Sequence, residues 1–191
     1  MQLVLASTSP FRLAVLKKLP LSFDTDSPDI DETALPNESP EQLVNRLAEA
    51  KARAVAPRHA HSLIIGSDQV AVLNGHILGK PGNHDNAVKQ LRDASGQKVE
   101  FKTGLCLLNS DTGQAQVACV PFTVQFRQLS DAQIERYLAH EQPYNCAGSF
   151  KSEGLGITLF EKLLGDDPNT LIGLPLIELV RMLKKEGITL P

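Results

Sequence analysis

Two kinds of hydrophobic pattern alternate along the chain. Short, unbroken apolar runs at residues 3–6 and 63–65 predict buried strands, the second covering 62–66, and apolar stretches at 99–108 and 116–126 predict two long strands. Residues 157–160 predict one further short strand.

A tight hairpin is expected after the second predicted strand. Asn74-Gly75 separates the apolar segments 70–73 and 76–78, and this dipeptide favours the left-handed conformations of a two-residue turn. The polar residues that precede the hairpin therefore lie in a connection between two strands.

Apolar residues at helical spacing predict five helices. Ser39 with Gln42, and Ser130 with Gln133, have the spacing of a capping box at a helix start. The expected helices cover residues 10–19, 40–55, 83–94, 131–140 and 176–186. Because helices and strands follow one another without strict alternation, we expect an α/β fold with a mixed twisted sheet and flanking helices.

The length of 191 residues suits one large α/β domain or two closely packed lobes around a shared core, and we expect a single domain spanning 1–191. A formal net charge of −3 gives no electrostatic reason to expect nucleic acid or an acidic membrane as partner. No stretch approaches the roughly 18 apolar residues of a membrane helix, and the first apolar run lacks a basic flank. We therefore expect a cytoplasmic protein.

The three cysteines form no CxxC pair and leave an odd thiol, so a disulfide framework is not expected. Cys146 is compatible with a catalytic nucleophile, but a small buried residue is the commoner role of a free cysteine.

The sequence Ser7-Thr8-Ser9-Pro10-Phe11-Arg12 joins the first strand to the first helix. A helix start exposes unpaired N–H groups that bind anions, and Arg12 adds a guanidinium that can grip a phosphate with two hydrogen bonds. The alternative is an ordinary capped helix, since Ser and Pro begin many helices that bind nothing.

Lys51 breaks the apolar pattern of the second helix. It follows Val44 by seven residues and Leu47 by four, so it falls within the apolar stripe. A lysine there either extends along the surface to reach solvent or points into a polar cleft.

Three more charged residues stand out. Asp68 follows a buried strand beside a glycine, where it either caps a turn or serves as a rigidly held functional carboxylate. Lys80 lies between Gly79 and Pro81 at the end of the hairpin. Glu32 belongs to an acidic loop that would by default be a solvated surface.

Together these residues provide cations for oxyanions, hard oxygen ligands for Mg²⁺ or Mn²⁺, and a base for water. Phosphoanhydride hydrolysis requires that combination. Neither GxxxxGK[ST] nor GxGxxG occurs, which disfavours P-loop NTPases and Rossmann dehydrogenases, and no HExxH pattern supports zinc. His59 and His61 are expected to be exposed.

The chain resembles the Maf family of nucleotide pyrophosphatases, whose α/β fold is shared with the inosine-triphosphate pyrophosphatases. The matching pieces occur in family order and span nearly the whole chain. They are Ser7-Thr8-Ser9-Pro10-Phe11-Arg12, Asp31-Glu32-Thr33, Glu49-Ala50-Lys51-Ala52, Gly66-Ser67-Asp68-Gln69, Gly79-Lys80-Pro81, Thr103-Gly104-Leu105, Ala147-Gly148-Ser149-Phe150 and Leu171-Ile172-Gly173-Leu174-Pro175.

The resemblance implies a cleft between two lobes and metal-dependent cleavage of a nucleoside triphosphate between its α- and β-phosphates. It places Asp68 on the family's general base and Glu32 on its metal-binding carboxylate, and our hypothesis is that Asp68 also helps to hold the metal. The phosphate-binding positions of the family correspond to Ser9, Arg12, Lys51 and Lys80. Whether Asp68 is the base or only a metal ligand stays open.

Three further positions resemble the Maf subgroup that acts on 7-methyl-GTP: Phe11, Gln69 and Glu153. The subgroup more often carries tryptophan at position 11. The chemistry agrees, because a positively charged 7-methylguanine favours stacking on an aromatic ring, and a glutamate can accept hydrogen bonds from guanine N1–H and the exocyclic amine. A core role for Phe11 and a surface role for Glu153 are the alternatives.

The expected function is hydrolysis of 7-methyl-GTP to 7-methyl-GMP and pyrophosphate, which removes modified nucleotides from the pool. A UTP or dTTP pyrophosphatase of the same family is one alternative. Another is a nucleotide-sensing regulator of cell division with incidental hydrolysis, because Maf proteins are also associated with division arrest. The expected partner is a small-molecule nucleotide, and a homodimer is compatible with the sequence.

Overall fold

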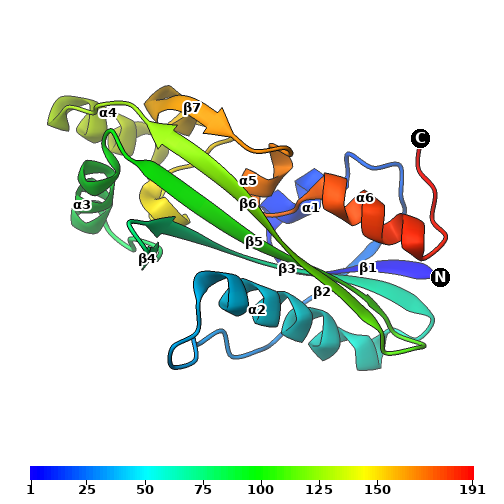
Figure 1. The fold of residues 1–191 in the computed structure, drawn as a ribbon. Coiled ribbons are helices and arrows are strands. Elements are labelled where there is room, and N and C mark those ends of the chain that lie inside the picture. Colours follow the sequence, from blue (N-terminus) through cyan, green and yellow to red (C-terminus); the bar gives the residue numbers. More distant parts are fainter. The chain divides into compact units, whose positions relative to one another are not determined.

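The computed structural model describes residues 1–191, which form an α/β fold with a mixed, seven-stranded sheet (Figure 1). The strands hydrogen-bond in the order β2-β1-β3-β5-β6-β7, and β4 pairs with β3. The strands are β1 (Gln2–Ala6), β2 (Asp24–Asp26), β3 (Ser62–Leu73), β4 (His76–Leu78), β5 (Lys98–Asn109), β6 (Ala115–Phe126) and β7 (Phe160–Leu164). The α-helices are α1 (Pro10–Leu16), α2 (Pro40–Val55), α3 (His84–Ala94), α4 (Asp131–Glu141), α5 (Asn169–Ile172) and α6 (Leu176–Lys185). Three short 3₁₀ helices complete the chain: η1 (Ala56–Arg58), η2 (Ala147–Ser149) and η3 (Leu155–Leu159).

The chain divides into two compact units, and β3, β5 and β6 contribute residues to both. The first unit comprises residues 1–69, 102–120 and 167–191, and the second comprises 70–101 and 121–166. The number of units agrees with the two lobes expected from the sequence. The single domain and its central cleft stay predictions.

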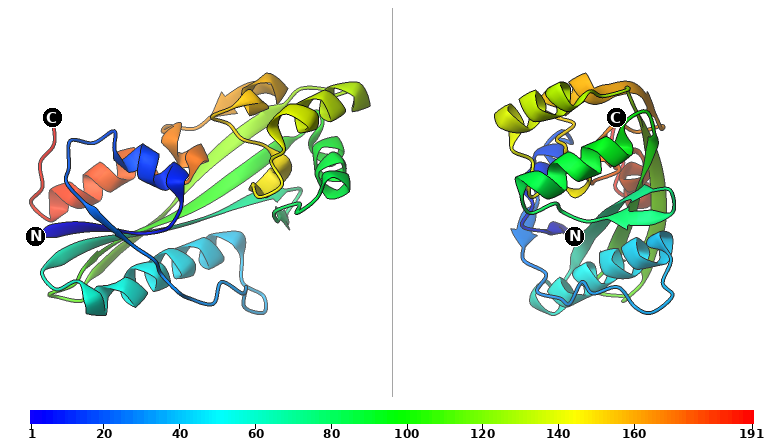
Figure 2. Two further views of the ribbon diagram at one scale, coloured as in Figure 1. Left: turned by 180° about the vertical axis from the view of Figure 1, so that it is seen from behind. Right: turned by 90° about the vertical axis from the view of Figure 1, so that its left-hand side faces the viewer.

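In the first unit, helices cover both faces of the sheet (Figure 2). One face packs against α1 and α6, through residues such as Leu16 and Leu179, and the other packs against α2 through Ala48 and Ala52. β1 runs parallel to both β2 and β3, so its side chains are buried on both faces. This explains the unbroken apolar run at residues 3–6.

The helix α2 lies unusually close to the strands beneath it. A Cβ atom at Gly66 would lie 2.0 Å from the carbonyl oxygen of Ala48, and one at Gly104 would lie 2.1 Å from that of Val44. Only glycine leaves room for this approach, which brings the backbone of α2 into direct contact with β3 and β5.

In the second unit, α3 and α4 pack against each other and the strands present an aromatic cluster. Phe150 makes edge-to-face contacts with three other phenylalanines, with ring centroids 4.9–5.5 Å apart. The partners are Phe101, Phe126 and Phe160. Asn74 and Gly75 have φ values of 50° and 81°, as the expected two-residue hairpin turn requires.

Most predicted elements are confirmed, including both capping boxes and all five helices. The prediction of a strand at residues 157–160 is wrong: residues 155–159 form η3, and β7 begins only at Phe160. The predicted break after residue 66 is also wrong, because β3 continues unbroken from Ser62 to Leu73. Asp68 therefore lies within a strand and caps no turn.

Candidate functional site

A buried lysine lies between two carboxylates in the first unit. Lys51 Nζ is 2.6 Å from Asp68 Oδ1 and 2.7 Å from Glu32 Oε1. The Lys51 and Asp68 side chains retain only 7% and 11% of their exposure, whereas Glu32 retains 59%. Lys51 is therefore buried against carboxylates and does not extend along the surface to solvent.

Secondary structure fixes the two buried members of this group. Lys51 occupies the face of α2 that contacts the sheet. Because α2 approaches the sheet closely at Gly66 and Gly104, the Lys51 side chain can reach Asp68 on β3. Asp68 follows Gly66 by two residues on β3, so its side chain points to the same face as the glycine. Burying a charged pair is costly unless each member has a partner at close range, and this pair satisfies that requirement.

Glu32 approaches the site from a loop that is anchored to α2. Arg46 donates two hydrogen bonds to Glu38, at 2.6 and 2.8 Å, and a third to the carbonyl oxygen of Thr33 at 3.1 Å. Asp31 accepts from the Thr33 amide at 2.9 Å and closes the loop locally. The predicted solvated surface is thus correct only in part. Glu32 is exposed, but its carboxylate is paired with Lys51.

Arg12 lies close enough to both carboxylates to interact with them electrostatically. Its Nε donates to the carbonyl oxygen of Gly173 at 3.0 Å, and Ser67 Oγ donates to the same oxygen at 2.8 Å. Burial lowers the pKa of the Arg12 guanidinium, and the charges of Asp68 and Glu32 oppose that shift. A guanidinium stays protonated in proteins, so Arg12 is a partly desolvated cation suited to a bound anion.

The start of α1 is built as a cap. Ser9 Oγ accepts from the Arg12 amide at 3.4 Å, and the Ser9 amide donates to Ser7 Oγ at 3.1 Å. The helix has only seven residues, so its dipole is weak. The side chain of Arg12 is therefore expected to contribute more to anion binding than the helix dipole does. Phe11, on the first turn, is 41% exposed, which excludes a core role.

Gln69 follows Asp68 on β3 and points to the opposite face of the strand. Its Nε2 donates to Thr103 Oγ1 at 2.7 Å and to the carbonyl oxygen of Thr170 at 2.6 Å. Thr103 Oγ1 also donates to that carbonyl oxygen, at 3.2 Å. These bonds fix the orientation of the Gln69 amide and leave Oε1 as its remaining acceptor.

The other two predicted site residues, Lys80 and Glu153, are exposed and belong to the second unit. The segment that carries Lys80 is tied to α3, because Gln90 donates to the Gly79 carbonyl at 3.1 Å and Asn86 to the Pro81 carbonyl at 2.9 Å. Lys80 thus projects from a fixed backbone. Glu32, Lys51, Asp68 and Arg12 thus form one group in the first unit. Lys80 and Glu153 belong to the second unit.

The carboxylates of Glu32 and Asp68 are hard oxygen donors of the kind that Mg²⁺ and Mn²⁺ prefer. No group of three or more His, Cys, Asp and Glu side chains in residues 1–191 could hold a metal by itself. Mg²⁺ sites often use one or two carboxylates together with substrate phosphates, so the two carboxylates fit a metal that arrives with its substrate.

His59 is less exposed than expected, because it bonds Asp26 at 2.9 Å.

Reasoning from single residues missed the backbone carbonyls of Thr170 and Gly173. They hold Gln69 and Arg12, yet a carbonyl oxygen has no sequence signature. The available signal was Gly173 itself, which adopts φ +100° at the end of α5 and has Arg12 Nε 3.3 Å from the position of a Cβ. A glycine is required there for both reasons.

The fold and the site define an α/β protein with a buried lysine–carboxylate group beside a desolvated arginine. The chain belongs to the Maf family: the family model described as "Maf-like protein" matches residues 2–186.

Three relatives are similar over almost their whole length. Proteins from Alcanivorax borkumensis, Nitrosococcus oceani and Pseudomonas aeruginosa, each named 7-methyl-GTP pyrophosphatase, are 62%, 60% and 56% identical. The matches cover 99%, 97% and 99% of this chain and 96%, 93% and 98% of the relatives, in the same order.

A solved structure shares the fold. The HAM1 protein from Coxiella burnetii superimposes with a TM-score of 0.54 at 15% identity, covering 97% of this chain and 99% of that chain. At this identity the likeness concerns architecture alone. None of the helices has both the length and the apolar character needed to cross a bilayer.

Proposed function

We propose that this chain is a 7-methyl-GTP pyrophosphatase, which hydrolyses the α–β phosphoanhydride to 7-methyl-GMP and pyrophosphate. The observation that carries the proposal is the buried contact of Lys51 with Asp68, beside Arg12, in a chain that is 56–62% identical to proteins named for this activity. Such a site combines cations for the phosphates with a fixed carboxylate for water.

In the proposed mechanism, Arg12, Lys51, Lys80 and Ser9 bind the triphosphate and offset its charge. Lys51 holds Asp68 by Oδ1, so we assign Oδ2 as the atom that receives the proton of the attacking water. Arg12 is oriented by the Gly173 carbonyl, which aims its terminal amino groups at the anion.

We propose further that Glu32 and Asp68 hold Mg²⁺ or Mn²⁺ together with the phosphates. Bound there, the metal would polarise the phosphoryl oxygens and increase the electrophilicity of phosphorus. When a nucleotide and its metal arrive, Lys51 can exchange a carboxylate contact for a phosphate contact without losing a counter-charge.

Three residues are proposed to select the base. The exposed ring of Phe11 offers a stacking face for the cationic 7-methylguanine, and the Glu153 carboxylate accepts from its N1–H and amine. Gln69 contributes Oε1, because its Nε2 is engaged by Thr103 and Thr170. Cytoplasmic location, a homodimer and the lack of nucleic-acid and membrane partners stay predictions.

The test is pyrophosphate release by the purified protein with Mg²⁺ or Mn²⁺, comparing 7-methyl-GTP, GTP, UTP and dTTP. A strong preference for 7-methyl-GTP supports the proposal, and a preference for UTP or dTTP overturns the substrate assignment. Nucleotide binding without turnover would instead favour the regulatory function.

Two of the residues proposed to select the base, Phe11 and Glu153, are tested by separate mutations. Phe11→Leu removes the ring but keeps an apolar side chain, and it should raise KM for 7-methyl-GTP more than KM for GTP, while Phe11→Trp should preserve the preference. Glu153→Gln should reduce activity on 7-methyl-GTP far more than on GTP. An unchanged preference in either Phe11→Leu or Glu153→Gln removes that residue from the assigned role.

A further inference from the structure

Glu153 belongs to a tight loop of residues 151–156 in the second unit. The Lys151 carbonyl oxygen accepts from the amides of Gly154 and Gly156, at 3.3 and 3.0 Å, and so closes the loop on itself. Ser152 Oγ donates to the Glu153 carboxylate at 3.2 Å. The position of the Glu153 carboxylate therefore depends on how this small loop is held.

One face of α4 holds both ends of the 151–156 loop. At the first end, Tyr137 Oη accepts from the Lys151 amide at 3.0 Å. At the other end, Glu141 Oε2 accepts from the Leu155 amide at 2.8 Å. Tyr137 and Glu141 are four residues apart and thus adjacent on the helix, so one turn of α4 fixes the loop at two points.

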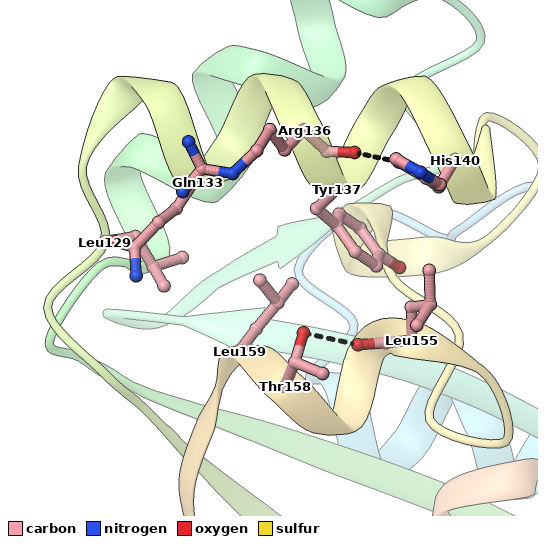
Figure 3. Close-up of a pocket in the computed structure, with 8 residues that line it drawn as sticks. All are labelled: Leu129, Gln133, Arg136, Tyr137, His140, Leu155, Thr158 and Leu159. Atoms are coloured by element: carbon pink, nitrogen blue, oxygen red, sulfur yellow. Dashed lines mark hydrogen bonds between the residues drawn. The ribbon is translucent and has the colours of Figure 1, made fainter.

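The Leu155 end of this loop borders an open space. A cavity of about 360 Å³ lies between α4 and η3, and Tyr137 and Leu155 form part of its wall (Figure 3). Leu155 is 44% exposed although it is a leucine. Because Leu155 packs against little at this end, the hydrogen bond of its amide to Glu141 is an important support for the loop.

Glu141 also contacts the lysine that begins the 151–156 loop. Lys151 Nζ donates to the Glu141 carbonyl oxygen at 3.2 Å and lies 3.4 Å from its carboxylate Oε1. Lys151 precedes Glu153 by two residues and is the nearest cation to it in the sequence. The Lys151 ammonium is thus held by Glu141, through its backbone carbonyl oxygen and its carboxylate.

The absence of a side chain at Gly154 leaves room for the Glu141 carboxylate. A Cβ at residue 154 would lie 2.7 Å from Glu141 Oε2, so the end of the Glu141 side chain would have to move. Any larger residue would have to displace the carboxylate that holds the Leu155 amide.

We propose that Glu141 is a positioning residue for base selection, which fixes the 151–156 loop and keeps Lys151 away from Glu153. This inference rests on the proposed function, because it concerns recognition of the cationic purine by Glu153. Glu141 itself acts through the loop and does not contact the substrate.

The experiment measures kcat and KM for 7-methyl-GTP and GTP in Glu141→Ala. We expect the ratio of the two kcat/KM values to fall about tenfold, the effect of losing one well-placed charge-assisted hydrogen bond, while kcat for GTP stays unchanged. Glu141→Gln keeps an acceptor for the Leu155 amide and should retain part of the preference. Gly154→Ala, which displaces the same carboxylate, should resemble Glu141→Ala.

The matched control is Glu135→Ala, on the same helix. Glu135 lies 2.9 Å from His84 Nε2 of α3, so its removal deletes a carboxylate and its contact on the same helix but leaves the 151–156 loop alone. Hydrogen exchange of the Leu155 amide reports loop support independently of activity, and it should become faster in Glu141→Ala and not in Glu135→Ala.

A double-mutant cycle separates positioning from general damage. If Glu141 acts through Glu153, then Glu141→Ala combined with Glu153→Gln is no less selective than Glu153→Gln alone. Additive losses, or a preference that survives Glu141→Ala, overturn the inference and leave the proposed function intact. A wild-type protein without preference for 7-methyl-GTP refutes the proposed function directly, whatever the variants do.

Discussion

The ammonium group of Lys51 lies 2.6 Å from Asp68 Oδ1, and both side chains are almost completely removed from solvent. A lysine on a helix and an aspartate on a strand, 17 residues apart in sequence, thus form the buried centre of the site. The two side chains can be replaced separately, so mutations can test the contribution of the pair to turnover and to stability.

Replacing the carboxylate by an amide tests the chemistry. Asp68→Asn keeps the shape and an oxygen for Lys51 but removes the proton acceptor, so kcat should fall by about 10²–10⁴-fold while nucleotide binding persists. Pyrophosphate release and calorimetric titration measure the two quantities. Asp93→Asn, at an exposed position of α3, is the matched control. Normal turnover of Asp68→Asn would exclude the role of Asp68 as base.

Removing the cation tests stability. Lys51→Met leaves a buried carboxylate without its partner, which costs about 3–5 kcal/mol. For a chain of this size the melting temperature should fall by about 10 °C. The double variant Lys51→Met with Asp68→Leu should recover most of that loss, because apolar side chains replace both charges. Equal melting temperatures for the wild type and Lys51→Met would show that the pair contributes nothing to folding.

A single added methyl group should force α2 away from the sheet. Gly66→Ala places a Cβ 2.0 Å from the Ala48 carbonyl oxygen, so α2 must move away and carry Lys51 with it. We expect a loss of about 1–3 kcal/mol in the free energy of unfolding by urea, and a lower kcat. Gly79→Ala is the control for stability, because no atom lies within 4 Å of its added Cβ. Equal stability of the two variants would contradict this account.

Acid should weaken the loop that carries Glu32. The hydrogen bonds from Arg46 lower the pKa of Glu38 from 4.5 to about 2. Because the folded value lies below the unfolded one, the stabilisation is present above about pH 4.5 and is lost as the pH falls toward 2. The stability difference between the wild type and Glu38→Gln, measured by urea unfolding, should shrink over that range. A difference that is independent of pH would exclude this linkage.

Local features were predictable from the sequence because each is formed within a few residues. The box of Ser39 and Gln42 starts α2, and Asn74-Gly75 turns the hairpin, whatever lies elsewhere in the fold. By contrast, residues 157–160 have the composition of a strand, yet residues 157–159 belong to a 3₁₀ helix and only Phe160 is in a strand. A short apolar run is compatible with either structure, and packing decides between them.

The sequence by itself determined that Lys51 is anomalous, since a lysine within an apolar stripe is visible from spacing alone. It also supplied the family pattern that groups Asp68 with Glu32 and Arg12. Only the tertiary structure decided which atoms meet: the contact of Lys51 with both carboxylates, and the Gly173 carbonyl that orients Arg12. These contacts join segments up to 161 residues apart, and their geometry depends on how closely helix and sheet approach, which no local pattern records.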